Sequence, residues 1–429
     1  MLRCASKGFL LFVTVINLCL VVREASAASY YIDSVSGNDY NTGTSPNSAW
    51  KSINKTADFG WQPGFQPGDT VYLNGFFGDG LWIQLDKSHG APGAPLRFTS
   101  LNPTSPATIA PHFTHGINVY SWLVGAQGYI TIDNLIIVGD GQKDAKNGQT
   151  CSGIFIYHDA PGDVSGFVID NVDVSGFSES GFFSFRYNES GKTGVIRDVT
   201  ITNSFFHDNP GFTGIQRPSG SGTVISGVVG AVVRNVSAYR NGAKNDNHGG
   251  GPVGIWTYDA DRVLIQNCSS YENLSENNDG GGFDFDGGTT NSIMENCASW
   301  DNWGPGYEAC SFTEGVMNNN GTSNNNTVRD SWSRGDGYGK GFASFGVFPY
   351  QVPITAFTVS NVVINITNYP CDDYGYDYAT HHGIWAEPPG PNTAGGTLHA
   401  TFSNVKVSCA GAAKNLNLVC DSTSTPLCK

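Results

Sequence analysis

Short stretches of alternating apolar and polar residues return along the chain from about residue 116 to residue 405, and each begins with glycine. An alternation with a period of two is typical of half-buried β-strands rather than of amphipathic helices. The leading glycines are Gly116, Gly153, Gly181, Gly214, Gly254, Gly282, Gly306, Gly341 and Gly383. The chain is therefore predicted to repeat one short Gly-led strand many times.

Each Gly-led strand is followed by a turn and by a second apolar strand that ends in asparagine or aspartate. These terminal residues are Asn134, Asn171, Asp198, Asn235, Asn267, Asn296, Asp330, Asn361 and Asn404. A short third segment, such as VDV, CSSY or CASW, comes next. Asn and Asp tolerate the left-handed backbone of a sharp corner, and stacked amides can hydrogen-bond along a column. We expect these residues to form an Asn/Asp corner ladder.

The spacing of the repeats indicates a solenoid. Gly153 and Gly181 are 28 residues apart, as are Gly254 and Gly282, and Gly306 follows after 24. One such unit cannot bury its apolar face alone, so the units must stack with their strands in parallel. A leucine-rich horseshoe would require Leu at fixed positions, which these repeats lack. The sequence predicts an all-β fold, a right-handed parallel β-helix of about nine or more coils in one single-stranded solenoid.

The two ends of the chain differ from this repeat. Residues 1–27 combine Arg3 and Lys7 with an apolar run and Ala-Ser-Ala, which predicts a signal peptide and a secreted, extracellular or cell-wall protein. No later stretch is apolar enough to suggest a membrane partner. We expect an N-terminal cap and first coils over 28–110, the β-helix over 111–408 and a Cys-rich tail over 409–429.

The charge of the chain restricts its partners. A formal net charge of −14 at pH 7 argues against nucleic acid. It would also repel a polyanionic glycan unless a divalent cation bridged the two. We therefore expect a polysaccharide substrate or cell-wall glycan as partner, and a monomeric protein.

Cysteines and glycosylation sequons fit an oxidising secretory route. Cys268 and Cys297 hold the same slot in adjacent repeats and are expected either to bridge or to form a ladder of free thiols, while a disulfide is expected in the tail among Cys409, Cys420 and Cys428. The sequons are Asn54, Asn188, Asn235, Asn267, Asn273, Asn320, Asn325 and Asn365. Corner positions Asn235 and Asn267 are expected to stay unmodified, and Asn273, Asn320 and Asn325 are candidate glycan sites.

One face of the solenoid is predicted to bind substrate. After each lead glycine, the first residue should point into the coil and the second outward. Outward aromatic rings are costly to leave bare, so they should stack on sugars or lie under the long Gly/Asn-rich loops before these strands. The substrate-binding candidates are Trp256, Tyr258, Phe183, Phe185, Gln216, His248 and Trp385.

The candidate catalytic residues lie in GGGFDFDGG and the following GYEAC. Asp284 and Asp286 are two apart on one predicted strand, so both should project outward, and Glu308 should lie beside Asp284 on the next coil. Aspartate is disfavoured inside strands, which points to function rather than to turn formation. Crowded carboxylates raise one another's pKa, as a general acid of a glycosidase requires. Asp279 is close enough in sequence to complete the site.

Calcium is the competing interpretation of the same residues. Asp279, Asp284 and Asp286 could hold Ca²⁺ in a polysaccharide lyase, although their spacing differs from an EF-hand loop. A lyase also needs a base to remove the α proton. Lys244, Lys340, Arg186 and Arg217 are the candidates, and each is more readily explained as an ordinary solvated charge.

The Gly-led strands and the Asx corner resemble the pectate-lyase-like right-handed β-helix superfamily. The phrase GGGFDFDGGTTNSIMENCASWDNWGPGY is most similar to family 9 polysaccharide lyases and their uncharacterised relatives. That resemblance implies a catalytic Lys on the Gly-led strand with calcium-binding Asp residues nearby. Carried onto this chain, the Lys position is Asp284, so the base implied by the family is replaced by a carboxylate.

Three functions remain in order of preference. The first is a glycoside hydrolase that uses Asp284, Asp286 and Glu308 and needs no cofactor. The second is a Ca²⁺-dependent polysaccharide lyase. The third is a non-catalytic β-helix that binds cell-wall glycan. The identity of residue 284 separates the first two and favours hydrolysis.

Overall fold

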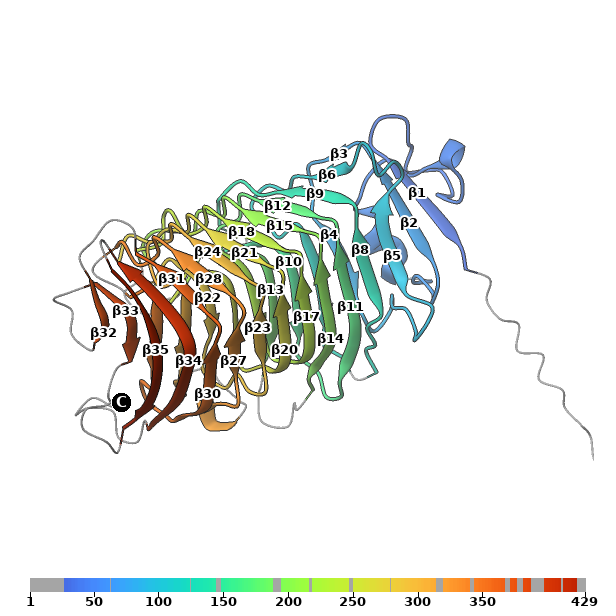
Figure 1. Ribbon diagram of the computed structural model, residues 1–429. Helices are drawn as coiled ribbons and strands as arrows, with labels where there is room; N and C mark the ends of the chain where they lie inside the picture. Colours follow the sequence, from blue (N-terminus) through green and yellow to red (C-terminus); the bar gives the residue numbers. More distant parts are fainter. Residues whose placement is uncertain are drawn as a thin grey trace, which may run out of the picture.

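A computed structural model of the chain describes residues 27–61, 63–123, 125–143, 148–187, 194–215, 218–246, 250–277, 279–313, 319–339, 343–366, 371–375, 381–386, 397–409 and 412–422. It forms one elongated solenoid of stacked coils, with the first coils at one end and the C-terminal strands at the other (Figure 1). This is the predicted all-β, right-handed parallel β-helix of more than nine coils. Residues 1–26, most of the predicted signal peptide, lie outside the described residues.

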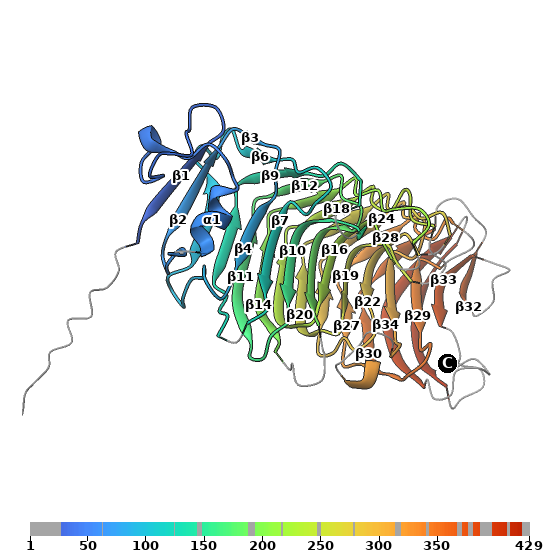
Figure 2. The same ribbon diagram turned by 180° about the vertical axis from the view of Figure 1, so that it is seen from behind.

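The Gly-led strands form one parallel sheet of eleven strands along the length of the solenoid (Figure 2). We call it the site sheet. Its strands are β4 (Leu81–Gln84), β7 (Ile117–Ser121), β10 (Ser152–His158), β13 (Ser180–Arg186), β16 (Ser221–Ser226), β19 (Val253–Tyr258), β22 (Gly281–Phe285), β25 (Tyr307–Cys310), β29 (Phe345–Phe348), β33 (His381–Ala386) and β32 (Cys371–Gly375).

The remaining strands form a second sheet that bends at the corner between the second and third strand of each coil. The second strands, with the terminal hairpin, are β1 (Ser29–Asp33), β2 (Thr70–Asn74), β5 (Leu96–Ser100), β8 (Ile130–Asp133), β11 (Val164–Asp170), β14 (Ile196–Thr202), β17 (Val228–Arg234), β20 (Asp261–Gln266), β23 (Ile293–Glu295), β26 (Ser323–Asn324), β27 (Thr327–Arg329), β30 (Ile354–Ser360), β34 (Leu398–Cys409) and β35 (Ala412–Asp421). The third strands are β3 (Phe76–Phe77), β6 (Ala107–Ile109), β9 (Leu135–Val138), β12 (Asp173–Ser175), β15 (Phe205–His207), β18 (Ser237–Tyr239), β21 (Ser269–Tyr271), β24 (Ala298–Trp300), β28 (Trp332–Arg334) and β31 (Val363–Asn365).

Three short helices complete the described chain: η1 (Pro46–Ser48), α1 (Lys55–Trp61) and η2 (Asn319–Gly321). Helix α1 packs against β4 and so covers the N-terminal end of the site sheet. At the other end, β35 pairs antiparallel with β34, although every other described strand pairing is parallel. None of the described helices is long and apolar enough to cross a membrane.

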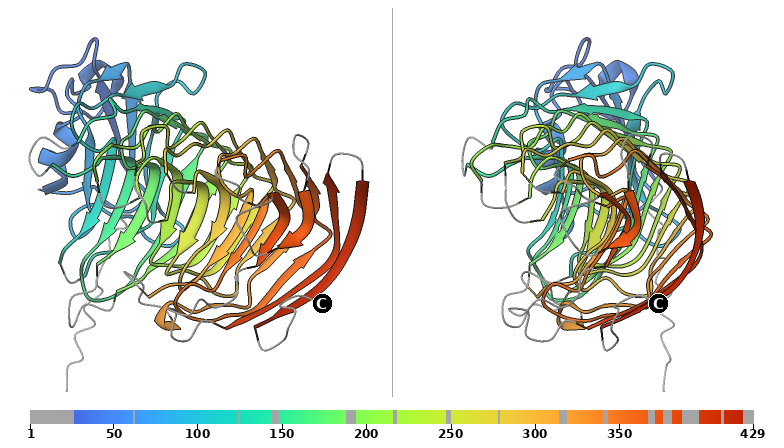
Figure 3. Two further views of the ribbon diagram at one scale, coloured as in Figure 1. Left: turned by 90° about the vertical axis from the view of Figure 1, so that its left-hand side faces the viewer. Right: turned by 60° about the vertical axis from the view of Figure 1, so that its left-hand side comes forward.

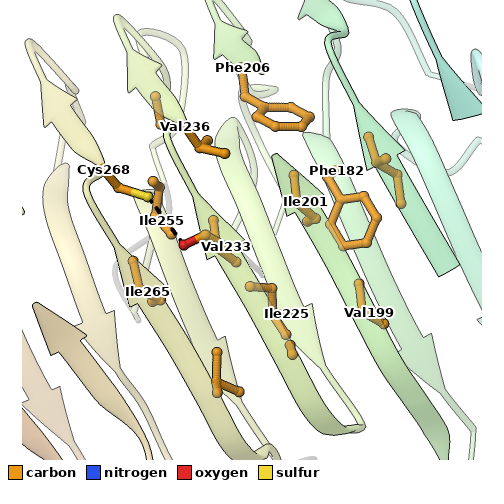
Figure 4. Packing of buried hydrophobic residues seen from close by; sticks show 14 of the residues in the cluster. Phe182, Val199, Ile201, Phe206, Ile225, Val233, Val236, Ile255, Ile265 and Cys268 are labelled. Atoms are coloured by element: carbon orange, nitrogen blue, oxygen red, sulfur yellow. Dashed lines mark hydrogen bonds between the residues drawn. The ribbon is translucent and has the colours of Figure 1, made fainter. Parts of the chain in front are cut away.

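The core fills the inside of the tube, which Figure 3 shows nearly end-on. Each of the three strands in a coil contributes inward side chains, and these stack on their counterparts in the next coil (Figure 4). Phe182 and Ile255 come from the site sheet, Ile201 from a second strand, Phe206 from a third strand, and Cys268 from the corner just before β21. Cys268 and Cys297 are both buried free thiols, so the ladder interpretation of this pair is confirmed.

Two Gly-led strands lie elsewhere than predicted. The strand expected after Gly214 is instead β16, and Gly214 sits in a turn with φ of 77°. In the later coil, β29 begins at Phe345, a core residue in register with Tyr307, whereas Gly341 was expected to lead the strand. The other lead glycines are needed because no Cβ fits: on Gly282 it would lie 2.4 Å from Ser299 Oγ and 2.7 Å from Gly306 O.

The corner ladder exists, with one correction. Eight of the nine predicted residues occupy the corner with φ between 51° and 55°, and Asn171 Nδ2 donates to Asn134 Oδ1 at 2.7 Å. Asp198 was wrongly placed there. The register aligns Asn203 with Asn171 and Asn235, while Asp198 aligns with Gly166 and Gly230 at a bulge earlier in the strand.

A second, buried ladder was not predicted. It consists of Asn209, Asn241, Asn273, Asn302 and Asp336. Each Asn Nδ2 donates to the Oδ1 of the next member, for example from Asn273 to Asn302 at 2.9 Å and from Asn302 to Asp336 at 2.7 Å. Asn273 is fully buried, so its prediction as a glycan site was wrong. Among the other candidate sites, Asn320 and Asn325 are exposed.

The tail adds the antiparallel strand β35 rather than an unpaired segment. Cys409 and Cys420 are each disulfide-bonded. The hairpin register pairs Cys409 with Ala412 and Cys420 with Ala400, so these two cysteines lie at opposite ends of the hairpin and do not bond to each other. The pairing of each stays a prediction.

Asp336 gives the buried ladder a testable pH dependence. Burial raises its pKa to about 7, although Ser333 and Asn302 donate hydrogen bonds to it. Because the folded pKa exceeds the unfolded value, stability is greatest at low pH and falls as the pH rises through about 7. Asp336→Asn keeps an oxygen that can accept the hydrogen bond from Asn302 but cannot ionise. Its free energy of unfolding relative to that of wild type should therefore increase by up to roughly 4 kcal/mol from pH 4 to pH 8. Chemical unfolding at both pH values measures this gain.

Asn302→Asp is the matched control, since it puts a carboxylate in the middle of the same ladder. It should be destabilised most at pH 8. An equal effect of Asp336→Asn at both pH values would contradict a titrating Asp336.

Candidate active site

Two columns of outward side chains cross the site sheet at the coil that carries the acidic phrase. In the first column, Asp284 is in register with Trp256 on one side and with Glu308 on the other. In the second, Asp286 follows Phe285 and so lies beside Tyr258 and Cys310, because Phe285 pairs with Thr257 and Ala309. The predicted outward direction of these side chains is confirmed, since Phe283, Phe285 and Tyr307 fill the core instead.

The three predicted catalytic carboxylates are close neighbours but are not open to solvent. Their exposed fractions are only 3% for Asp284, 6% for Asp286 and 8% for Glu308. Neighbouring coils are about 4.8 Å apart and alternate residues about 6.6 Å apart, so all three lie within one small region. The cluster is therefore a buried acidic site rather than a charged surface patch.

Asp279 joins this cluster from the loop before β22. It has a left-handed backbone with φ of 53°, and its Oδ2 accepts a hydrogen bond from the Gly251 backbone N–H. The loop is fixed to its neighbours by backbone hydrogen bonds from Gly280 N to Pro252 O at 2.9 Å and from Gly304 N to Gly280 O at 3.1 Å. The Gly/Asn-rich loops before β19, β22 and β25 thus stack on one another along this edge of the site sheet.

Burial raises the pKa of all four carboxyl groups, and repulsion from neighbouring carboxylates raises it further for Asp284, Asp286 and Glu308. Burial is the largest cause in each case. The pKa of Asp279 rises only to about 6 because the Gly251 N–H stabilises its anion. That of Asp286 rises to about 8, through burial and the Asp279 charge, against hydrogen bonds from Gly287 N–H and the Cys310 thiol. The pKa values of Asp284 and Glu308 lie well above their usual range.

These shifts divide the cluster by protonation state. Near pH 7, Asp279 is the carboxyl group that is most readily ionised, and Asp286 still holds its proton. Two carboxyl groups with separated pKa values provide one acid and one base in the same site. The charges that shift these four groups are all carboxylates of the described chain, and no Lys, Arg or His of that part contributes.

Asp284 has a further feature that suggests a ligand. Its Oδ1 is buried and has no hydrogen-bond partner in the described structure. A buried polar atom without a partner costs about 1–3 kcal/mol, so such atoms are normally paired. An oxygen kept unpaired beside other functional carboxyl groups is therefore a candidate contact for a substrate hydroxyl.

The predicted substrate-binding residues fall into three groups. Trp256, Tyr258, Phe183 and Phe185 point outward from the site sheet, as predicted, and Trp256 Nε1 donates to Ser221 Oγ at 3.1 Å. Trp385 also leaves the core but is only 2% exposed, with its ring packed edge-on against Phe348 at 5.5 Å. Gln216 and His248 lie outside the described residues.

The two candidate lyase bases that the structure describes, Arg186 and Lys244, do not lie in this cluster. Arg186 forms a buried ion pair with Asp259 at 2.8 Å. Lys244 is exposed in a turn. Arg217 and Lys340 lie outside the described residues. For calcium, no group of three or more His, Cys, Asp or Glu side chains in the described chain is arranged to hold a metal ion.

Cys310 is a functional candidate that sequence reasoning missed. It occupies the outward position beside Asp286, and its thiol donates a hydrogen bond that lowers the pKa of that carboxyl group. Its place two residues after Glu308, with the same outward direction, was the available signal.

Comparisons with known proteins give relatives of the same architecture. No protein-family model matches the chain. A lacto-N-biosidase of Bifidobacterium longum subsp. longum is 25% identical over 214 residues, which cover 44% of this chain and only 12% of that protein. A crystal structure of a GH136 lacto-N-biosidase from Eubacterium ramulus matches with a TM-score of 0.54 and 15% identity, covering 89% of this chain and 67% of that one.

The pectate lyase Pel9A matches less well, with a TM-score of 0.48 and 18% identity over 78% of each chain. At these identities the lacto-N-biosidase structure shows a shared fold, the parallel β-helix, and no more. Neither match transfers an activity.

The buried acidic cluster should reduce the stability of the protein. Because the folded pKa of Asp284 is raised, ionisation opposes folding, and stability falls as the pH rises above the unfolded value of 3.8. Asp284→Asn should therefore stabilise the protein by roughly 1–2 kcal/mol at pH 8, with a smaller gain at pH 5. Denaturant unfolding at the two pH values measures both gains. Asp301→Asn, at a side chain 55% exposed, should change neither, and destabilisation of Asp284→Asn at pH 8 would contradict this account.

Proposed function

We propose that this protein is a glycoside hydrolase in which Asp286 is the general acid and Asp279 supplies the ionised carboxylate. The single observation that carries the proposal is geometric: Asp284, Asp286 and Glu308 lie side by side on adjacent coils, almost fully buried, and Asp279 joins them from the loop before β22 with its carboxylate accepting a hydrogen bond from the Gly251 N–H. Burial raises the pKa of Asp286 to about 8 but that of Asp279 only to about 6, which favours a proton on Asp286 and a negative charge on Asp279. Two carboxyl groups in these two states are what hydrolysis of a glycosidic bond requires.

The proposed reaction begins with proton transfer from Asp286 to the glycosidic oxygen. The bond from the anomeric carbon to that oxygen breaks, and the departing sugar leaves with the proton. The Asp279 carboxylate then acts as nucleophile or as the base that deprotonates a water molecule, and water completes the new hydroxyl. Water supplies the hydroxyl group that the anomeric carbon gains and the proton that replaces the one lost by Asp286, so no cofactor is consumed.

Asp284 and Glu308 complete the site as groups that bind the substrate. Their raised pKa values keep them neutral near pH 7, so each can donate as well as accept a hydrogen bond. The unpaired Asp284 Oδ1 is positioned to accept from a sugar hydroxyl. Tyr258, beside Asp286 and half-buried, offers an apolar face on which a pyranose ring can stack, whereas Trp256, in register with Asp284, is buried beneath it.

The relatives support the same reaction class without fixing the substrate. Two of the similar proteins are lacto-N-biosidases, and the one from Eubacterium ramulus, a GH136 enzyme, shares the fold. The lyase alternative has less support, because position 284 carries a carboxylate and no described cation reaches the cluster. Bound Ca²⁺ was expected only if the protein were a polysaccharide lyase. Secretion, a monomeric state and the neutral or weakly charged glycan partner stay predictions.

The experiment is an incubation of the purified protein with neutral and uronic-acid glycans, including lacto-N-biosides, with calcium or with EDTA. We expect new reducing ends without unsaturated uronate products. Asp286→Asn and Asp279→Asn should each lower kcat by about a thousandfold or more, while Asp301→Asn should keep wild-type activity. Calcium-dependent unsaturated products would contradict the proposal and indicate a lyase. Glycan binding without turnover would indicate the third, non-catalytic function.

The pH dependence of hydrolysis gives an independent check. Activity should rise as Asp279 loses its proton near pH 6 and fall as Asp286 loses its proton near pH 8. Cys310→Ala removes a hydrogen bond that favours the Asp286 anion, so the alkaline limb should move to higher pH. Cys310→Ser restores a donor and is the matched control. An unchanged alkaline limb in Cys310→Ala would contradict the assignment of Asp286 as the acid.

A further inference from the structure

Four aromatic side chains form a patch on the site sheet, several coils to the N-terminal side of the carboxylates. They are Phe155, Tyr157, Phe183 and Phe185, and we call them the distal patch. Phe155 pairs with Phe183, and Tyr157 with Phe185, on the adjacent strands β10 and β13. All four rings point outward and are half-buried, so each keeps part of its surface accessible.

The distal patch lies in the same two columns as the proposed catalytic groups. The register runs from Phe155 through Phe183, Val224 and Trp256 to Asp284. Phe183 is therefore three coils from Asp284 and Phe155 is four, or about 14 Å and about 19 Å along the solenoid. A ligand that lies along the site sheet could reach both the patch and the carboxylates.

The outward strand residues between them carry no formal charge, although the pKa of Tyr258, which burial raises, is raised further by the nearby Glu179 carboxylate just before β13. The outward residues from β10 to β19 are the four patch rings together with Val224, Ser226, Trp256 and Tyr258. Val224 and Trp256 are buried in a small apolar cluster on which Phe183 and Tyr258 pack. On a chain with a net charge of −14, an uncharged aromatic strip suits a neutral ligand with apolar faces better than it suits an ion.

Ring orientation distinguishes this patch from the other aromatic column of the protein. On the third strands, His207, Tyr239, Tyr271 and Trp300 stack face to face, with interplanar angles of 1° to 7°. Their faces are occupied by one another. In the distal patch, Phe155 and Phe183 are tilted by 40° and Phe183 and Phe185 by 54°, with centroids 5.6 and 5.7 Å apart. Tyr157 and Phe185 are closer to parallel, at 20° and 6.2 Å, and one face of Phe155 is stacked on His115 at 4.8 Å. Phe183, which is tilted against both Phe155 and Phe185, leaves part of its face available to a ligand.

The described residues offer fewer accessible rings beyond the carboxylates. On that side, Glu308 is followed in register by Gly346 and then by Trp385, which is almost fully buried against Phe348. Phe348 itself follows Cys310 in the second column and is half-buried. A ligand that extends from the acidic cluster therefore meets the larger group of described accessible rings in the N-terminal direction.

We propose that the distal patch binds sugar units of a neutral oligosaccharide three to four coils away from the bond that is cleaved. The patch serves the proposed hydrolase site and rests on that assignment. Because one coil advances by about the length of one pyranose ring, the protein should prefer substrates that extend several sugars from the cleaved bond toward the N-terminal coils. Such remote contacts contribute binding energy without touching the reacting atoms.

Hydrolysis of a series of neutral oligosaccharides of increasing length tests this proposal. For wild type, kcat/KM should rise with length until the substrate spans the patch. In Phe155→Ala with Phe183→Ala, the ratio of kcat/KM for the longest to the shortest substrate should fall about tenfold. Phe205→Ala, at an aromatic side chain 46% exposed on β15, is the control and should keep the wild-type ratio. Thermal unfolding of each variant identifies loss of folding.

Direct binding separates failure of the patch from failure of the hydrolase. Asp286→Asn, with and without the two patch substitutions, is titrated with the longest oligosaccharide by calorimetry. Weaker binding upon patch substitution supports the distal patch, even if no glycan is hydrolysed. A wild-type ratio of kcat/KM and unchanged binding in a folded patch variant would overturn the distal patch, while turnover that depends on Asp286 would leave the hydrolase intact.

Discussion

Each coil of this protein hydrogen-bonds to the next in parallel register, and this pairing forces side chains of successive coils into columns. A column is stable when its members suit one another at a spacing of about 4.8 Å. Apolar side chains meet this condition by stacking, and asparagine meets it because its amide both donates and accepts. The buried ladder from Asn209 to Asn302 shows the second solution, with each amide bonded to the next.

Carboxylates cannot meet this condition among themselves. Asp284 and Glu308 stand in one column, and two ionised neighbours there would repel each other while both were removed from water. The protein keeps them in place with raised pKa values and with an oxygen of Asp284 left unpaired. Such an arrangement lowers stability without serving the core, and functional sites are where folded proteins usually retain it.

The fold and the site contribute differently to the proposed function. A fold fixes where side chains are placed and does not imply a function, so the parallel β-helix alone does not select a reaction. The selection comes from local chemistry, namely a carboxyl group where a lyase base would stand, a backbone N–H that favours the Asp279 anion, and a buried Asp286 that stays protonated. In the same way, the proposed role of the aromatic columns that lead to these groups is to select substrates by their length.

The sequence by itself determined the solenoid, the outward direction of Asp284, Asp286 and Glu308, and most of the corner ladder, because these depend on local periodicity and on backbone conformations that Asn and Asp tolerate. It misplaced Asp198 and the strand after Gly214, because a bulge and an inserted loop shift the register without changing the local pattern. Only the tertiary structure decided that Asn273 is buried, that Cys310 faces Asp286 and that the carboxylates lie out of solvent. Burial of a side chain depends on the loops and neighbouring coils that surround it, and every pKa shift in the site depends on that burial. The residues on the same strand do not reveal these surroundings.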